Sequence, residues 1–319
     1  MTAARKTVQL NLILYAASAV FMYVLVTLSL LVPDWIGARK SPFACDDFSI
    51  RNPYKKQTVS TTALILITLF SSLVVIIVAE FVIDRHSGSD VIFKFRHWRI
   101  SALVVHIVAF HGYFQLGFVM QVVVNQVTKY AVGRLRPHFF TVCMPGNYTC
   151  TQPGELIYEY TCTGDPKKIE EGRLSFFSGH SSIVMYTAAF LIIYLHARIG
   201  QITPRFILST LQTLLFSAGL FICYTRLQDY FHHPSDIATG AAVGILGAIY
   251  SCYAWADIWR QSGHYSAVHG KVVEVEDATT PIAIKVEPRS APHERTISEG
   301  SPNLPDTRQA SSVVYTEHL

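Results

Sequence analysis

Long apolar runs alternate with short polar segments along most of this chain. Six runs approach or exceed the roughly 20 helical residues that cross a hydrocarbon core of about 30 Å; they lie at residues 8–32, 61–83, 101–127, 181–197, 206–224 and 237–255. The fourth is the shortest and reaches the required length only if its helix begins near Ser178. Half of the 319 residues are apolar and 15% are charged, unlike an ordinary soluble domain. The pattern predicts an all-α integral membrane protein with six transmembrane helices.

The first run has a second interpretation, because it follows Arg5 and Lys6 as the apolar part of a signal peptide would. It is too long for a typical signal peptide and lacks a clear small-x-small cleavage site. We therefore interpret residues 8–32 as a retained first helix.

The last part of the chain differs in composition. Residues 261–319 contain many charged and small polar residues and neither Phe nor Trp. Such a segment buries too little apolar area to offset the entropy of ordering. We expect a membrane domain over residues 1–260 and a disordered cytosolic tail over 261–319.

Three polar clusters interrupt the apolar pattern, at residues 129–137, 178–180 and 226–236. They follow the third run, precede the fourth and follow the fifth. If all six runs cross the membrane, the three clusters lie on the same side. The span count therefore predicts that they share one site.

The side on which this site lies is predicted from two features. The sequon at Asn147 lies between the first two clusters and can be glycosylated only on the luminal or extracellular side. Four cysteines fall in the same outer loops, where oxidation is allowed; three pairings stay open among Cys45, Cys143, Cys150 and Cys162. Counting positive residues does not decide the orientation. We expect cytosolic termini and an extracellular or luminal site, most simply at the plasma membrane.

In the first cluster, Lys129 and Arg136 are seven residues apart, so two helical turns would place both on one face. A point charge and a planar fork would then hold a phosphate from two directions. Cations at the end of a span can equally be snorkelling side chains. We interpret Arg134 as a plain surface cation.

In the second cluster, Ser178, Gly179 and His180 stand where the fourth run begins. Free N–H groups at a helix N-terminus bind anions, and a histidine beside an anion can hold a proton near neutral pH. The alternative is a capping serine followed by an incidental histidine.

In the third cluster, Arg226 precedes His232 by six residues, and Asp236 follows His232 by four, with Pro234 favouring a helix start. Asp236 could orient a histidine that attacks phosphorus. The spacing does not separate His232 from His233, and a His-Asp pair at a helix start can be purely structural.

In this order, the clusters resemble the signature of the phosphatidic acid phosphatase type 2 superfamily, K-x6-R-P, P-S-G-H and S-R-x5-H-x3-D. All internal spacings are kept, from Lys129 to Asp236, and only Phe177 and Thr225 depart from the usual proline and serine. The six runs and the glycosylatable loop are most similar to the lipid phosphate phosphatase branch, over residues 8–259.

The resemblance implies a role for each site residue. His232, rather than His233, would be the nucleophile, Asp236 would support it, and His180 would protonate the leaving alkoxide. The phosphate-binding residues would be Lys129, Arg136, Ser178, Gly179 and Arg226. The family's reaction needs neither a metal nor another cofactor.

The resemblance also implies a phosphate monoester carried by a membrane lipid as substrate, and no nucleic-acid partner; it leaves the oligomeric state, homo-oligomers included, open. One rival is a phosphotransferase similar to sphingomyelin synthases. Another is a catalytically silent protein similar to the plasticity-related proteins. A channel or transporter is a third, since His106, His111 and Gln115 lie in the third run. The complete set of cations and histidines favours the phosphatase.

Overall fold

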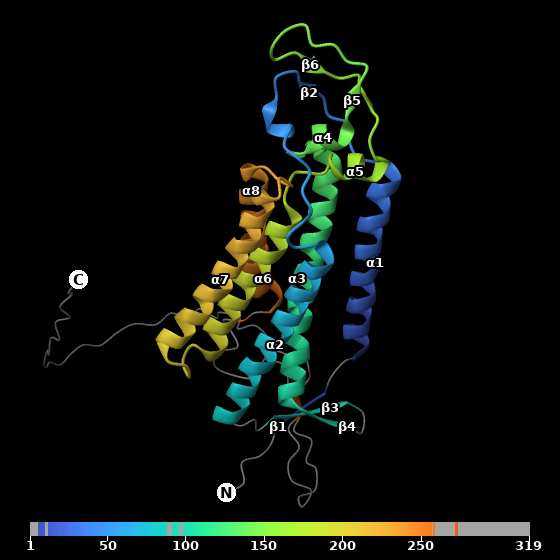
Figure 1. Cartoon of the computed structure of the whole chain (residues 1–319). Coiled ribbons are helices and arrows are strands. Elements are labelled where there is room, and N and C mark those ends of the chain that lie inside the picture. The colour runs from blue at the N-terminus through green and yellow to red at the C-terminus, as the bar shows by residue number, and fades with distance from the viewer. Residues whose placement is uncertain are drawn as a thin grey trace, which may run out of the picture. The chain divides into compact units, whose positions relative to one another are not determined.

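The computed structural model describes residues 6–9, 12–87, 91–95, 98–256, 258 and 272–273, all in the first of two units, Met1–Glu276. Six long helices run side by side in this unit (Figure 1): α1 (Leu12–Ile36), α2 (Thr61–Ser87), α3 (Ala102–Val132), α6 (Gly179–Ile199), α7 (Arg205–Gln228) and α8 (Pro234–Tyr250). A π-helical turn, η2 (Ser251–Trp255), extends α8. Each predicted apolar run is therefore a helix.

Five of these helices, α2, α3, α6, α7 and α8, are long and apolar enough to cross a membrane. In α1, the part whose side chains are described forms a shorter apolar helix, Ala17–Ser29. The protein is thus a helical integral membrane protein. Membrane crossing by α1 stays a prediction from the sequence.

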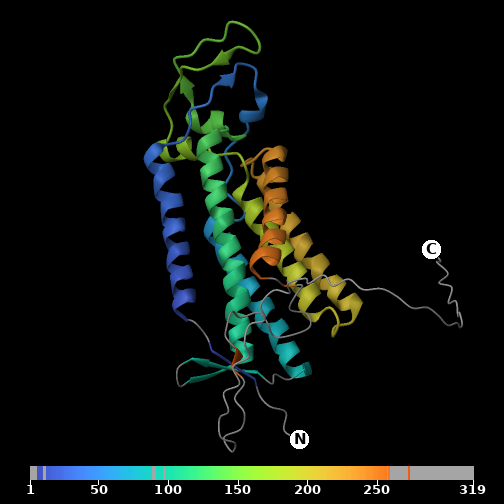
Figure 2. The ribbon, with the colours of Figure 1, turned by 180° about the vertical axis from the view of Figure 1, so that it is seen from behind.

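Helix α6 lies at the centre of the bundle and contacts α2, α3, α7 and α8 (Figures 1 and 2). Two thirds of its apolar window is buried inside the protein, compared with a third or less for the other four spans. The outward faces of α2 and α7 carry exposed apolar side chains, as expected of surfaces that contact lipid. The start of α6 is consequently held from several sides.

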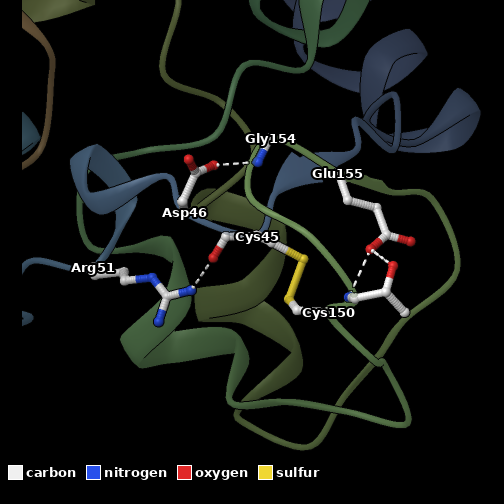
Figure 3. Close-up of a disulfide and its surroundings, with 7 residues drawn as sticks. Cys45, Asp46, Arg51, Cys150, Gly154 and Glu155 are labelled. Carbon is white, nitrogen blue, oxygen red and sulfur yellow. Dashed lines mark hydrogen bonds between the residues drawn. A yellow bond between two sulfur atoms is a disulfide. The ribbon is translucent and has the colours of Figure 1, made fainter.

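One end of the bundle carries the long loops, residues 37–60 and 133–178, and is called the loop end below. The loops contain two-stranded ribbons, β2 (Phe43–Ala44) with β6 (Leu156–Ile157) and β5 (Pro145–Gly146) with β7 (Thr161–Cys162), and short helices η1 (Phe48–Ile50), α4 (Phe139–Cys143) and α5 (Pro166–Glu171). Disulfides Cys45–Cys150 and Cys143–Cys162 join them and answer the pairing that the sequence left open. Figure 3 shows the first disulfide; nearby, Arg51 donates to the Cys45 carbonyl and Gly154 donates to the Asp46 carboxylate.

The opposite end, called the sheet end, carries a four-stranded sheet that the sequence analysis did not predict. Its strand order is β4 (Trp98–Ser101), β3 (Val91–Phe95), β1 (Lys6–Gln9) and β8 (Val272–Val273). The first predicted span therefore begins at Leu12 instead of residue 8, because the preceding residues pair parallel with β3. Strand β8 belongs to the segment 261–319, which was predicted to be disordered, and it pairs antiparallel with β1. The rest of that segment lies outside the described residues.

Candidate active site

The three polar clusters meet at the loop end of the bundle. The first spans the last turn of α3 and the loop after it, the second begins α6, and the third joins α7 to α8. His180 is within electrostatic reach of Lys129, Arg226 and His232, and His232 is within reach of Lys129 and Arg136. The structure thus brings together the residues that the span count assigned to one site.

Lys129 and Arg136 do not share a helix face, contrary to the expectation from their spacing. Helix α3 ends at Val132, where Gly133 adopts a left-handed conformation with φ 63° and its N–H bonds to the Lys129 carbonyl at 3.0 Å. A side chain at Gly133 would be strained and would also collide with the Arg39 backbone. Lys129 therefore comes from the last turn of the helix, and Arg136 comes from the loop after it.

Arg136 is buried, with 5% of its surface exposed. Its Nη1 donates to the Glu171 carboxylate of α5 at 3.0 Å, and its guanidinium lies 5.1 Å from the centroid of the Phe231 ring. Its Nε is buried and has no hydrogen-bond partner among the described residues. A buried donor without a partner is costly, so this atom is suited to a ligand oxygen.

Arg226 is 1% exposed and is held by neighbours on both sides. Its Nε and Nη2 donate to the Thr225 hydroxyl at 3.2 and 3.0 Å, and Nη2 also donates to Asp229 at 3.0 Å. Its Nη1 makes a longer contact of 3.4 Å with Gln57. Thr225, one of the two residues that depart from the family signature, keeps the hydroxyl that a serine would supply here.

At residues 178–180, the structure shows a capping serine and also leaves backbone N–H groups at the start of α6 that could bind an anion. Ser178 is the N-cap of α6, and its side chain accepts from the Ser181 N–H. We had expected the Ser178 N–H to bind phosphate. It donates instead to the Asp236 carbonyl at 3.0 Å and is not available to a phosphate. The N–H groups of Gly179 and His180 lie in the first helical turn and have no partner within the helix. A Cβ on Gly179 would lie only 2.7 Å from Asn125 Oδ1, so the close packing requires glycine.

The His180 side chain contacts the segment before α2. Its Nε2 lies 3.1 Å from the Val59 carbonyl. A carbonyl only accepts hydrogen bonds, so Nε2 carries the proton and Nδ1 is left to exchange a proton with a ligand.

His232 is oriented by a backbone carbonyl. Its Nδ1 lies 2.8 Å from the Ser175 carbonyl and therefore donates, which leaves the lone pair on Nε2. Burial lowers the pKa of His232 to about 3; Arg136 and Lys129 act in the same direction, and Asp236 opposes them. The ring is thus neutral at physiological pH, as a nucleophile must be.

Asp236 does not contact His232 in the way we expected, since Oδ2 lies 3.9 Å from Nδ1. The same oxygen accepts from the Ser175 hydroxyl at 2.6 Å and from the His233 backbone and ring at 3.0 and 3.2 Å. Asp236 therefore supports His232 through Ser175, whose carbonyl receives the Nδ1 proton.

Arg134 is not a plain surface cation. Its Nη1 donates to Asp236 Oδ1 at 2.5 Å and to the Ser235 hydroxyl at 2.8 Å. The Arg134 side chain is 37% exposed, while the Asp236 carboxylate is fully buried. Arg134 and His233 also line a cleft, together with residues of the 41–50 loop segment. His233 lines this cleft, whereas His232 is held against the Ser175 carbonyl.

Several contact residues were missed by the sequence analysis. Ser175 lies just before the second motif, and Asn125 fixes the Phe177 carbonyl from one turn before Lys129. Glu171 and Asp229 are acids that pair with the two buried arginines. Their charge is the one signal in the sequence that could have identified them. Asn147, predicted to be glycosylated, is exposed in the loop with φ 55°.

Comparisons with known proteins agree with this site. Residues 110–260 match the family model described as the PAP2 superfamily. The chain is 34% identical over 280 residues to "Phospholipid phosphatase homolog 1.2 homolog" of Caenorhabditis elegans, covering 85% of this chain and 79% of the relative. It is 34% identical over 221 residues to human "Phospholipid phosphatase 2" (67% and 73% covered) and 32% identical over 226 residues to mouse "Phospholipid phosphatase 1" (67% and 77% covered). No solved structure matches the chain.

Proposed function

The chain belongs to the PAP2 superfamily as a lipid phosphatase similar to the phospholipid phosphatases, and we propose that it hydrolyses lipid phosphate monoesters through a phosphohistidine. The substrates would be phosphatidate and related lipids, namely lysophosphatidate, sphingosine 1-phosphate and ceramide 1-phosphate. The reaction would need no Mg²⁺, because protein cations meet the phosphate charge.

One observation carries this proposal. The neutral His232 Nε2, freed by the Nδ1 bond to Ser175, lies within electrostatic reach of two cations from different segments, Lys129 and Arg136. We call Lys129, Arg136 and Arg226 the phosphate clamp. A nucleophile beside an excess of positive charge matches what phosphoryl transfer requires, which is positioning and charge stabilisation.

In the first step, His232 Nε2 attacks phosphorus, an N–P bond forms, and the bond from phosphorus to the lipid oxygen breaks. The phosphate clamp and the Gly179 N–H stabilise charge on the equatorial oxygens. His180 donates its proton to the leaving alkoxide, which departs as diacylglycerol or the corresponding alcohol. A dianionic substrate favours the protonated form of His180 that this step needs.

In the second step, water attacks the phosphohistidine. His180, now neutral, accepts the proton of the water, a new O–P bond forms, and the N–P bond breaks. Inorganic phosphate leaves, and His232 recovers its lone pair. Asp236 acts through Ser175 in both steps by keeping the Nδ1 proton in place.

The site would face the extracellular or luminal side, with six spans, both termini in the cytosol and the plasma membrane as the main location. Two disulfides at the loop end support this orientation, since disulfides persist in oxidising compartments. The exposed Asn147, which lies between strands β5 and β6 at that end, would carry a glycan. Residues 1–260 would form the catalytic domain.

The test measures phosphate release from short-chain phosphatidate in excess EDTA, comparing the purified wild type with His232→Gln. The matched control is His233→Gln, which changes the adjacent histidine. We expect chelator-resistant release by the wild type, none by His232→Gln, and substantial activity in His233→Gln. Brief incubation with radiolabelled substrate should label the wild-type protein and not His232→Gln.

The outcome that would contradict the proposal is also defined. If folded wild type released no phosphate from phosphatidate, lysophosphatidate or sphingosine 1-phosphate, the phosphatase activity would be refuted. If His232→Gln kept its activity, the phosphohistidine step would be wrong.

A further inference from the structure

A segment outside the three motifs contacts residues of two of them. Residues 54–60, which we call the strap, precede α2 and contact His138 and the C-terminal end of α7. The Tyr54 ring packs on His138, with ring centroids 5.2 Å apart, and Lys55 donates to the Gln228 carbonyl at 2.9 Å. With the Val59 carbonyl on His180, the strap bridges two of the three motifs.

Asp229 is the acidic residue at the centre of these contacts. It is 5% exposed and lies three residues after Arg226. Its Oδ1 accepts from the Thr58 hydroxyl at 2.8 Å, and its Oδ2 accepts from the Thr58 N–H at 2.8 Å and from Arg226 Nη2 at 3.0 Å. One buried carboxylate thus joins the strap to the phosphate clamp.

The donors of Arg226 show what this contact achieves. A guanidinium has five N–H groups in a fixed plane. Nε and Nη2 are occupied by the Thr225 hydroxyl and Asp229, and only Nη1 retains a long contact, to Gln57. Asp229 and Thr225 therefore fix one edge of the guanidinium, which leaves the Nη1 edge for a ligand.

We infer that Asp229 is a positioning residue for phosphoryl transfer, which aims the Nη1 edge of Arg226 at the transferred phosphoryl group and latches the strap over the site through Thr58. This inference rests on the proposed function. Asp229 touches neither the substrate nor the reacting atoms. Its effect on the reaction is transmitted through Arg226.

The first experiment compares Asp229→Asn with Thr58→Val. Asparagine keeps an acceptor oxygen but removes the charge, whereas valine removes only the hydroxyl of the strap. A hydrogen bond to a charged group contributes about 1.5–3 kcal/mol, so we expect kcat to fall about tenfold to a hundredfold in Asp229→Asn. In Thr58→Val the fall should be at most about threefold, because Asp229 keeps its charge and its bonds from the Thr58 N–H and Arg226 Nη2.

A second readout separates positioning from folding. Vanadate adopts the five-coordinate geometry of the phosphoryl group in transit, so its inhibition constant reports on the aim of Arg226. For Asp229→Asn this constant should rise by the same factor by which kcat falls, with KM nearly unchanged. A loss of folded protein alone would lower the apparent kcat and leave the vanadate constant unchanged, which would overturn the inference.

A double-mutant cycle with Arg226→Lys tests whether Asp229 acts through Arg226. Lysine lacks the planar fork, so adding Asp229→Asn to Arg226→Lys should cost less than about twofold. Equal costs in the two backgrounds would overturn the inference, as would Thr58→Val matching Asp229→Asn. Phosphate release by the wild type is measured in parallel and tests the proposed function, which fails if no phosphate is released. The ratios of kcat between the variants and the wild type test the role of Asp229 alone.

Discussion

Two buried polar clusters lie at opposite ends of the same helices and are satisfied in opposite ways. At the sheet end, Glu80 of α2 accepts from Tyr194 at 2.7 Å and from Arg198 through two bonds of 2.9 Å, and lies 3.4 Å from His106. At the loop end, Lys129 and Arg136 lie within electrostatic reach of the neutral His232, and Lys129 and Arg226 lie within reach of His180. Among the described residues, the carboxylate that pairs with Arg136 is that of Glu171, whose side chain is 44% exposed.

The difference distinguishes a structural cluster from a site. Ionisable groups inside a membrane are costly and mark functional sites by default. The Glu80 cluster is an exception, since one carboxylate meets one guanidinium and two further side chains, and it ties α2, α3 and α6 together. The phosphate clamp keeps an excess of positive charge and an open Nε on Arg136. Excess charge and open donors, more than burial, therefore indicate where the ligand binds.

The largest effect on stability is expected at the sheet end. Glu80→Gln leaves Arg198 buried without a counter-charge, which should lower the free energy of unfolding by about 3–5 kcal/mol. The measurement is unfolding by denaturing detergent, with phosphatase activity normalised to folded protein, which should stay near the wild-type value. Adding Arg198→Gln removes the orphaned charge and should restore part of the stability.

If Glu80→Gln were as stable as the wild type, the sheet-end cluster would not be the structural clamp described above. If its activity per folded molecule fell severely instead, the cluster would be coupled to the site, and the contrast between the two ends would fail.

The next effect is on catalysis. Arg136→Gln removes a cation that meets charge in the transition state, so kcat/KM should fall about a hundredfold to a thousandfold. Stability should stay the same or rise, because the variant relieves repulsion among the phosphate clamp. Activity and melting temperature, measured on the same preparation, check both expectations.

Arg173→Gln is the matched control for Arg136→Gln. Arg173 is also a buried arginine of the loop end, but it donates to the Tyr160 hydroxyl at 2.7 Å and stacks on Phe139. It should lower stability and leave kcat/KM per folded molecule unchanged. If the two variants had equal effects on activity, the assignment of Arg136 to the phosphate clamp would be wrong.

Much of the fold could be predicted from the sequence because its signals are local. Apolar runs set the six helices, Ser178 caps α6 as an N-cap serine does, and Pro234 begins α8. Motif spacing identified the residues that the structure gathers at the loop end. His106, one of the residues behind the channel or transporter alternative, makes a buried contact with Glu80.

The remaining features depend on contacts between distant residues, which no local pattern specifies. Arg134 reaches Asp236 across 102 positions and Thr58 reaches Asp229 across 171. The spacing of Lys129 and Arg136 suggested one helix face, and Gly133 ends the helix between them. The sheet joins segments that are far apart in the sequence, and its two-residue strand β8 is too short to show an alternating pattern.

The smallest effect concerns pH and a second buried histidine at the loop end. His138 donates from Nδ1 to the Tyr230 carbonyl at 2.8 Å, and burial lowers its pKa to about 4, with Arg136 acting in the same direction. Above pH 6.5 the ring is neutral in both the folded and unfolded states. Below that pH, His138 binds a proton in the unfolded chain but stays neutral in the folded protein, so the free energy of unfolding falls as the pH falls towards 4. Between pH 7 and pH 5 this costs about 2 kcal/mol.

His138→Asn can keep a donor to the Tyr230 carbonyl and does not titrate, so it should remove this part of the acid sensitivity. The melting temperatures of both proteins, measured in one detergent from pH 7 to pH 5, should decline less steeply for the variant. His232, whose pKa is lowered to about 3 mainly by burial, contributes the same acid sensitivity in both proteins and cancels in the comparison. Parallel declines would mean that the His138 ring takes up a proton in the folded state. Burial and the positive charge of Arg136 would then not keep the folded-state pKa of His138 low.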